Sequence, residues 1–197
     1  PYHQAKGLCH LIEEHGGEAV RFPTIGIEKA LNSDALAATL TAVPYAHVAV
    51  FMSSNAAHYG LNLLQNSGIA LPVGIEVLAI GPGTAAQLAQ NGVVAKAVPP
   101  DQFNSEALLQ LETLATPAGK SVLIFRGEGG REWLANQLRE AGARVVLVEC
   151  YRRSLPKTTD GKVIARWREQ GINIVTLTSV LAVDHLVMLL GSSADIL

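Results

Sequence analysis

The sequence contains few of the residues that build disulfide or metal frameworks. Cys9 and Cys150 are the only cysteines, and they lie at unrelated positions. Neither has a second cysteine three residues away, and the six histidines form no His-Glu-x-x-His pair, so the common zinc motifs are excluded. We therefore expect no metal site, no disulfide framework, and a protein of the reducing cytoplasm.

The sequence also lacks an excess of either charge and any long apolar run. Lys and Arg number 15 against 17 Asp and Glu, the formal net charge is −2, and no basic run is present. We therefore expect no nucleic-acid partner. The longest apolar runs are much shorter than a membrane span, and no signal-peptide pattern opens the sequence. What remains is a globular composition over 197 residues, 49% apolar and 16% charged, which suits one large or two small domains.

Helix and strand patterns alternate along the chain. Short apolar runs predict strands at residues 18–22, 48–52, 75–81, 95–100, 121–125, 144–149 and 173–177. Helical spacing predicts helices at 4–15, after Ser53 or Ser54, at 82–92, at 103–114, after the glycines that follow residue 126, and at 178–190. Strands separated by single helices form parallel sheets with helices on both faces, so the fold class is α/β with doubly wound parallel sheets.

A weak internal repeat indicates two domains of this kind. Residues 48–61 align with 173–186 at an offset of 125, and residues 12–22 align with 138–148 at an offset of 126. Two matches at nearly one offset favour a real duplication. The alternative is that any two strand–helix units share such a pattern.

The repeat also predicts how the two domains are connected. Residues 30–150 would form a continuous domain, inserted into a domain that is split between 1–26 and 154–197. Two side-by-side connections would join the domains at a cleft, where ligands usually bind. The split domain would lack a strand before Pro1 and a strand–helix unit after Leu197, so we expect a chain that is clipped at both ends.

The run RGEGGR, residues 126–131, lies between a predicted strand and a predicted helix, where phosphate-binding turns occur. It lacks the Lys and the hydroxyl of a P-loop, and position 132 is Glu where the dinucleotide fingerprint requires its third glycine. A nucleotide is therefore disfavoured. Either the run is a flexible turn, or its backbone N–H groups bind an anion with help from Arg126 or Arg131.

Four further helix starts carry short hydroxyl or amide side chains. They are residues 53–55, 81–84, 104–106 and 178–179. Each could serve only as a helix cap, or together they could bind a ligand with several carboxylates. Tyr151, beside Arg152 and Arg153 at the proposed domain crossing, is either an anchor or a proton donor. Tyr45 and Tyr59 are expected to be packing residues.

Five segments share an order and spacing that is specific when they are taken together. They are VFMSSNAA, AIGPGTAAQL, NSEALL, FRGEGGREWLANQLREAGARVVLVECYRR and VTLTSVLAVDHL. Over essentially its whole length the chain resembles the uroporphyrinogen-III synthase family. The resemblance implies two α/β domains joined by a two-stranded linker with an open cleft. It also implies an enzyme that cyclises hydroxymethylbilane to uroporphyrinogen III in haem biosynthesis, inverting ring D through a spiro intermediate, without metal or organic cofactor.

The resemblance also assigns roles to single residues. Tyr151 matches the tyrosine proposed to assist departure of the substrate hydroxyl, so it is the expected catalytic residue. The resemblance and the helix starts together predict a substrate-binding set: Ser53, Ser54, Asn55, Gly83, Thr84, Ser105, Gly129, Arg131, Thr178 and Ser179. Met52 stands where a hydroxyl residue is often found and is expected only to pack.

The expected partner is thus a small linear tetrapyrrole, with no nucleic acid and no membrane. We expect a cytoplasmic monomer that makes transient contact with the preceding enzyme of the pathway. Two alternatives are kept: a non-enzymatic two-domain module that binds a small anion, and a nucleotide-dependent enzyme on a doubly wound sheet, which the glycine spacing disfavours.

Overall fold

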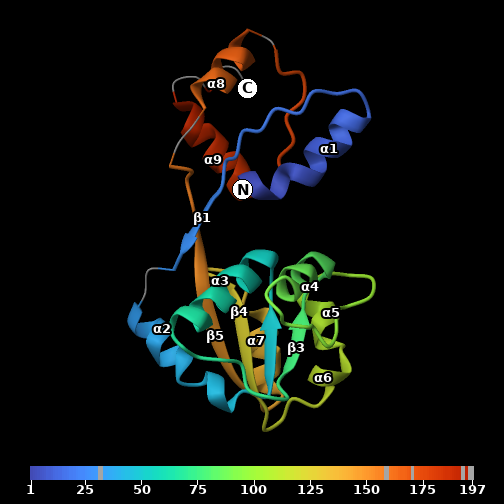
Figure 1. Cartoon of the computed structure of the whole chain (residues 1–197), viewed down its shortest axis with the longest axis vertical. Helices are drawn as coiled ribbons and strands as arrows, with labels where there is room; N and C mark the ends of the chain where they lie inside the picture. The colour runs from blue at the N-terminus through green and yellow to red at the C-terminus, as the bar shows by residue number, and fades with distance from the viewer. Residues whose placement is uncertain (31–32, 158–159, 170, 192–193, 195–197) are drawn as a thin grey trace. The chain divides into compact units, whose positions relative to one another are not determined.

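The computed structural model describes residues 1–30, 33–157, 160–169, 171–191 and 194. The chain forms two compact units: unit 1 is Pro1–Glu28 with Arg153–Leu197, and unit 2 is Lys29–Arg152. It passes between the units twice, in strand β1 (Gly26–Lys29) and in strand β5 (Arg144–Ser154). These two strands are neighbours in one sheet (Figure 1).

The sheet has five strands in the order β1-β5-β4-β2-β3. Strands β2 (Val48–Phe51), β3 (Glu76–Ala79), β4 (Ser121–Gly127) and β5 pair in parallel. Every residue of β2 and β4 is buried, as expected for strands covered on both faces. The predicted α/β class is confirmed, although the predicted strand at 95–100 is reduced to a single bridge between Leu78 and Ala97.

Helices cover both faces of this sheet. The helices of unit 2 are α2 (Ser33–Leu40), η2 (Val43–Tyr45), α3 (Ser54–Asn66), α4 (Pro82–Ala89), α5 (Ser105–Leu109), α6 (Glu112–Ala115) and α7 (Trp133–Glu140). On one face α3 approaches Phe125, which stacks on Phe51 with ring centroids 4.4 Å apart; a Cβ at Gly60 would lie only 2.6 Å from Phe125. On the other face, Leu138 of α7 packs in a cluster with Ile124. Neighbouring strand residues thus face opposite helices.

Two predictions about unit 2 are wrong. Residues 103–114 form two short helices rather than one, because Leu111 has an extended backbone with ψ of 139°. In one continuous helix Leu108 and Leu114 would point about 120° apart, whereas the break lets both reach the core. Tyr45, expected to pack, ends a short 3-10 helix at the surface and is 74% exposed.

Unit 1 consists of helices joined by extended segments. Its helices are η1 (Tyr2–Ala5), α1 (Lys6–Glu14), α8 (Gly161–Arg168) and α9 (Val180–Leu190). The predicted strands at 18–22 and 173–177 are wrong: neither segment belongs to a strand within the described residues, and Ile174 is 81% exposed. An extended segment becomes a stable strand only when a neighbouring strand pairs with its backbone groups.

Side-chain contacts hold the extended segment that follows α1. Glu18 forms an ion pair with Arg166 of α8 at 2.5 Å. The carbonyl oxygen of Thr24 lies 2.8 Å from Nδ1 of His185 in α9. The segment therefore contacts α8 and α9 through side chains where a sheet was expected.

Candidate active site at the carboxyl edge of the unit 2 sheet

The predicted site residues of unit 2 lie where its parallel strands end. β2, β3 and β4 end at Phe51, Ala79 and Gly127, and a helix or a turn begins directly after each. Because the strands are parallel, these ends share one edge of the sheet (Figure 1). In sheets of this kind, ligands bind at the carboxyl ends of the strands.

The start of α3 carries the pair Ser53 and Ser54. Ser53 is the N-cap, because its Oγ accepts a hydrogen bond from the backbone N–H of Ala56 at 3.0 Å. The same Oγ lies 3.1 Å from the phenol oxygen of Tyr151, and either hydroxyl can donate. Ser54 instead faces α4, since a Cβ at Gly83 would lie 3.5 Å from Ser54 Oγ. Asn55 follows in the first turn and is half-buried.

The starts of α4 and α5 are packed together. A Cβ at Gly81, the N-cap of α4, would lie 3.1 Å from the ring of Phe103. The cap of α5 is Asn104, whose Oδ1 accepts from the N–H of Ala107 at 2.8 Å, and Ser105 is the first helical residue. In α4 Gly83 is exposed, whereas the predicted ligand Thr84 is only 4% exposed.

Tyr151 is fixed inside unit 2. Its side chain is 2% exposed, and its ring lies over Gly127, where a Cβ would stand 2.7 Å from Cζ. The register of β4 and β5 pairs Arg126 with Glu149 and Gly127 with Tyr151, so Cys150 is an extra residue at a bulge. The bulge turns the phenol toward the start of α3.

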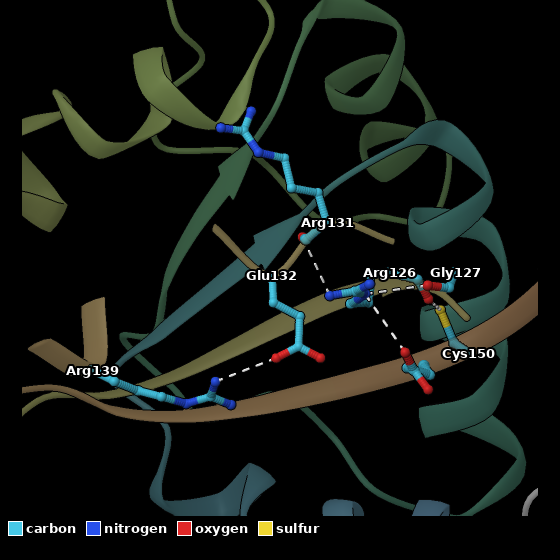
Figure 2. Close-up of polar contacts among 7 residues, drawn as sticks. Arg126, Gly127, Arg131, Glu132, Arg139 and Cys150 are labelled. Atoms are coloured by element: carbon cyan, nitrogen blue, oxygen red, sulfur yellow. Dashed lines mark hydrogen bonds and ion pairs between the residues drawn. The ribbon is translucent and has the colours of Figure 1, made fainter. Parts of the chain in front are cut away.

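The turn after β4 is built around Arg126, which is 6% exposed (Figure 2). Its Nε donates to the carbonyl of Gly127 at 3.2 Å, and its Nη1 donates to the carbonyl of Arg131 at 3.4 Å. Its Nε also lies 3.7 Å from a carboxylate oxygen of Glu149. The side chain of Arg131 points away from Arg126 and pairs with Glu106 of α5 at 2.7 Å.

Sequence reasoning named both arginines as alternatives but missed their different environments. The signal was present in the run SVLIFRG, where Arg126 follows five residues of a fully buried strand. A charged residue that continues such a run must be buried with its strand. The exposed Arg131 follows two glycines, and the left-handed backbone of Gly129, with φ of 68°, marks a turn at the surface.

Cys150 lies beneath this turn. Its thiol is 3.3 Å from the carbonyl oxygen of Arg126 (Figure 2). The carbonyl oxygen of Ala56 lies 3.7 Å from the same thiol. Burial raises the pKa of the Cys150 thiol to about 12. The thiol is therefore neutral at physiological pH and does not provide a nucleophilic thiolate.

Thr178 and Ser179 belong to unit 1, at the start of α9. Ser179 is the N-cap, with Oγ accepting from the N–H of Ala182 at 3.2 Å, and both residues are exposed. The site residues of unit 2 are thus gathered at one edge, and Ser179 has the same capping role in the other unit.

The described residues offer neither a metal-binding cluster nor a membrane-spanning helix. They contain no group of three or more His, Cys, Asp or Glu side chains placed to hold a metal ion. Within the same part of the chain, every helix is too short or too polar to cross a membrane.

Comparison with known proteins assigns this chain to a family. The family model described as "Uroporphyrinogen-III synthase HemD" matches residues 7–197. The chain is 32% identical to the uroporphyrinogen-III synthase of Salmonella typhimurium over 179 residues, which cover 91% of this chain and 73% of that protein. It is also 32% identical to the Escherichia coli enzyme, over 87% of this chain and 70% of that one.

A solved structure shares the fold. A crystal structure of a mutant uroporphyrinogen III synthase from Thermus thermophilus matches with a TM-score of 0.62 and 18% identity, over 95% of this chain and 74% of that one. At this identity the match supports the fold alone. Sequence identity and the family model carry the assignment: the chain belongs to the uroporphyrinogen-III synthase family.

Proposed function

We propose that the reaction of this chain takes place at the carboxyl edge of the unit 2 sheet. As a uroporphyrinogen-III synthase, the chain cyclises hydroxymethylbilane to uroporphyrinogen III with ring D inverted. Family membership decides against a non-enzymatic anion-binding module. The observation that supports this location is the hydrogen bond between Ser53 Oγ and the Tyr151 phenol, at the start of α3.

The first step needs a proton, because the hydroxyl of ring A leaves as water. A tyrosine phenol carries its proton at neutral pH, and a serine hydroxyl accepts one hydrogen while it donates its own. Tyr151 is buried and Ser53 is only half-buried, so Ser53 is the better placed to touch a ligand. Tyr151 therefore supplies the proton through Ser53.

The remaining steps depend more on the positioning of the substrate than on acid catalysis. Ring D attacks through its substituted carbon, and the resulting spiro intermediate fragments and recloses with ring D reversed. Spontaneous closure gives the type I isomer, so the enzyme must hold the flexible chain in the fold that favours this attack. Holding two reacting groups in place can supply most of a rate enhancement, and a proton donor adds a smaller factor.

The protein positions the substrate by binding its carboxylates. Hydrogen-bond donors that suit them stand together at the proposed site: Ser54 beside Gly83 at the starts of α3 and α4, and Arg131 held against α5 by Glu106. We assign the same role to Asn55, Ser105 and Gly129 on this edge, and to Thr178 and Ser179 at the start of α9. Thr84 is nearly buried, so its contribution is to hold the turn that presents Gly83.

We further propose a cytoplasmic monomer that uses neither metal nor organic cofactor. Two isolated, buried cysteines suit a reducing compartment. Because the free bilane closes by itself, a transient contact with the enzyme that supplies it would limit its loss to the type I isomer.

Tyr151→Phe tests the proton donor. It removes the phenol hydroxyl and keeps the ring over Gly127, so we expect a folded protein whose kcat falls about 100-fold with little change in KM. Turnover is measured with freshly prepared hydroxymethylbilane, and the type I and type III products are separated by chromatography. Tyr45→Phe is the matched control, because Tyr45 is exposed and lies outside the site.

Two results would contradict the proposal. Unchanged turnover in Tyr151→Phe would return Tyr151 to a packing role. If the wild-type protein yields only the type I isomer, the chain lacks the proposed synthase activity.

A further inference from the structure

Arg126 is a buried cation that its surroundings neutralise only in part. Its side chain is 7% exposed, and the nearest carboxylate, Glu149, lies 3.7 Å from Nε and is itself 43% exposed. Burial of a charge is costly unless hydrogen bonds and an opposite charge compensate it. Its hydrogen bonds within the described part of the chain come from Nε and Nη1, to two backbone carbonyls.

The two carbonyls are those at the two ends of the glycine turn. Arg126 binds Gly127 and Arg131, so one guanidinium fixes both ends of the loop (Figure 2). Its Nη2 makes no hydrogen bond to any described residue and lies beneath Gly130, where a Cβ would stand only 2.7 Å away. Glycine at 130 therefore lets the guanidinium reach the inner side of the turn.

Two backbone N–H groups of the turn have no backbone acceptor among the described residues. The N–H of Glu128 donates to the carbonyl of Tyr151 at 2.8 Å. The next glycines, Gly129 and Gly130, are exposed, and their N–H groups donate to no carbonyl among the described residues. A turn with two free N–H groups and a cation behind it suits a carboxylate.

We propose that Arg126 is a positioning residue for substrate binding. It holds the 127–131 turn by its two carbonyls, so that the N–H groups of Gly129 and Gly130 receive one carboxylate of the bilane, and its charge stabilises that carboxylate from behind. This inference rests on the proposed location of the reaction. The sequence analysis left Arg126 and Arg131 as alternatives for this role; the burial of Arg126 and the ion pair of Arg131 with Glu106 favour Arg126.

Arg126→Lys and Gly130→Ala test the proposal together. Lysine keeps the charge but cannot bind both carbonyls at once. Alanine at 130 keeps Arg126 but displaces Nη2, and it lies on an exposed turn where folding tolerates the change. In each variant we expect KM for hydroxymethylbilane to rise at least tenfold and kcat to stay within threefold, because one charge-assisted contact is lost from bound substrate.

Arg139→Gln is the control, since Arg139 is a half-exposed arginine of α7 that contacts Glu132 and Asn136 outside the turn. Its KM should not change. A purely structural role would lower the unfolding midpoint and leave KM per folded molecule unchanged in both test variants, and that result overturns the proposal. If Tyr151→Phe still loses turnover, only the role of Arg126 fails; if it also behaves like wild type, the location of the reaction fails with it.

Discussion

Gly127→Ala tests the placement of the phenol that we propose as the proton donor, without altering the phenol itself. A Cβ at 127 would lie 2.7 Å from Cζ of Tyr151, 2.8 Å from Cε2 and 3.0 Å from the hydroxyl oxygen. Carbon atoms in contact prefer about 3.5–4.0 Å, so the ring would have to move by roughly 1 Å. Gly127 does not have a positive φ, and alanine fits its backbone.

The ring has little space in which to move. Tyr151 is 2% exposed, its hydroxyl is bound to Ser53, and the ring of Tyr59 lies 6.0 Å from its own, between centroids. Overpacking of such a site costs about 1–3 kcal/mol. Because the phenol must leave Ser53 to make room, we expect turnover per folded molecule to fall about 100-fold, as in Tyr151→Phe.

Gly119→Ala separates displacement of the phenol from loss of stability. Gly119 has φ of 76° with open space around it, so alanine there costs about 1–2 kcal/mol through backbone strain alone. It precedes β4, at the edge of the sheet opposite the site. Urea unfolding gives both stabilities, and chromatography gives turnover and the type III fraction. If Gly127→Ala lowers turnover per folded molecule no more than Gly119→Ala does, the reasoning about the phenol is refuted.

Two further predictions concern stability. The folded pKa of Cys150, about 12, is raised from 9.0, so the neutral thiol stabilises the fold below pH 9 and this contribution is lost between pH 9 and 12. Between pH 8 and 10 the wild type should lose about 1 kcal/mol more unfolding free energy than Cys150→Ala, and parallel urea-unfolding profiles would contradict the burial of the thiol. Ser179→Ala removes the cap of α9 and should lower stability by about 1 kcal/mol, whereas Ser179→Asp keeps an acceptor for Ala182; equal thermal midpoints for the two variants would exclude the cap.

Local chemistry explains which elements could be predicted. The strands of unit 2 are short apolar runs because both of their faces are covered, and that burial is visible in composition alone. Ser53, Asn104 and Ser179 were predictable as caps because a short polar side chain before an apolar helix has few other uses. Met52 packs against the core cluster, as its replacement of a hydroxyl residue led us to expect.

The wrong predictions share a physical cause. Residues 173–177 have the β-branched composition of a strand, but composition reports only how well a residue suits a pleated surface. Whether a neighbouring strand is present is not a local property. Val175 and Leu177 therefore belong to no strand within the described residues and are 43% and 38% exposed. The break at Leu111 is similar, because the core that both flanking leucines must reach is defined by distant strands.

The contacts of the proposed site depend on the bulge in β5, which no sequence pattern predicts. Simple alternation along β5 would pair Gly127 with Cys150, but the bulge places Tyr151 opposite Gly127 and leaves Cys150 unpaired. This one-residue shift brings the phenol within 3.1 Å of Ser53, which lies 98 residues away in the chain. The bulge also leaves the thiol of Cys150 against the carbonyl of Arg126. The phenol and the neutral thiol are thus positioned by one irregularity between two strands. A sequence could supply both Tyr151 and Ser53 and still form no such contact if the strands paired in regular register throughout.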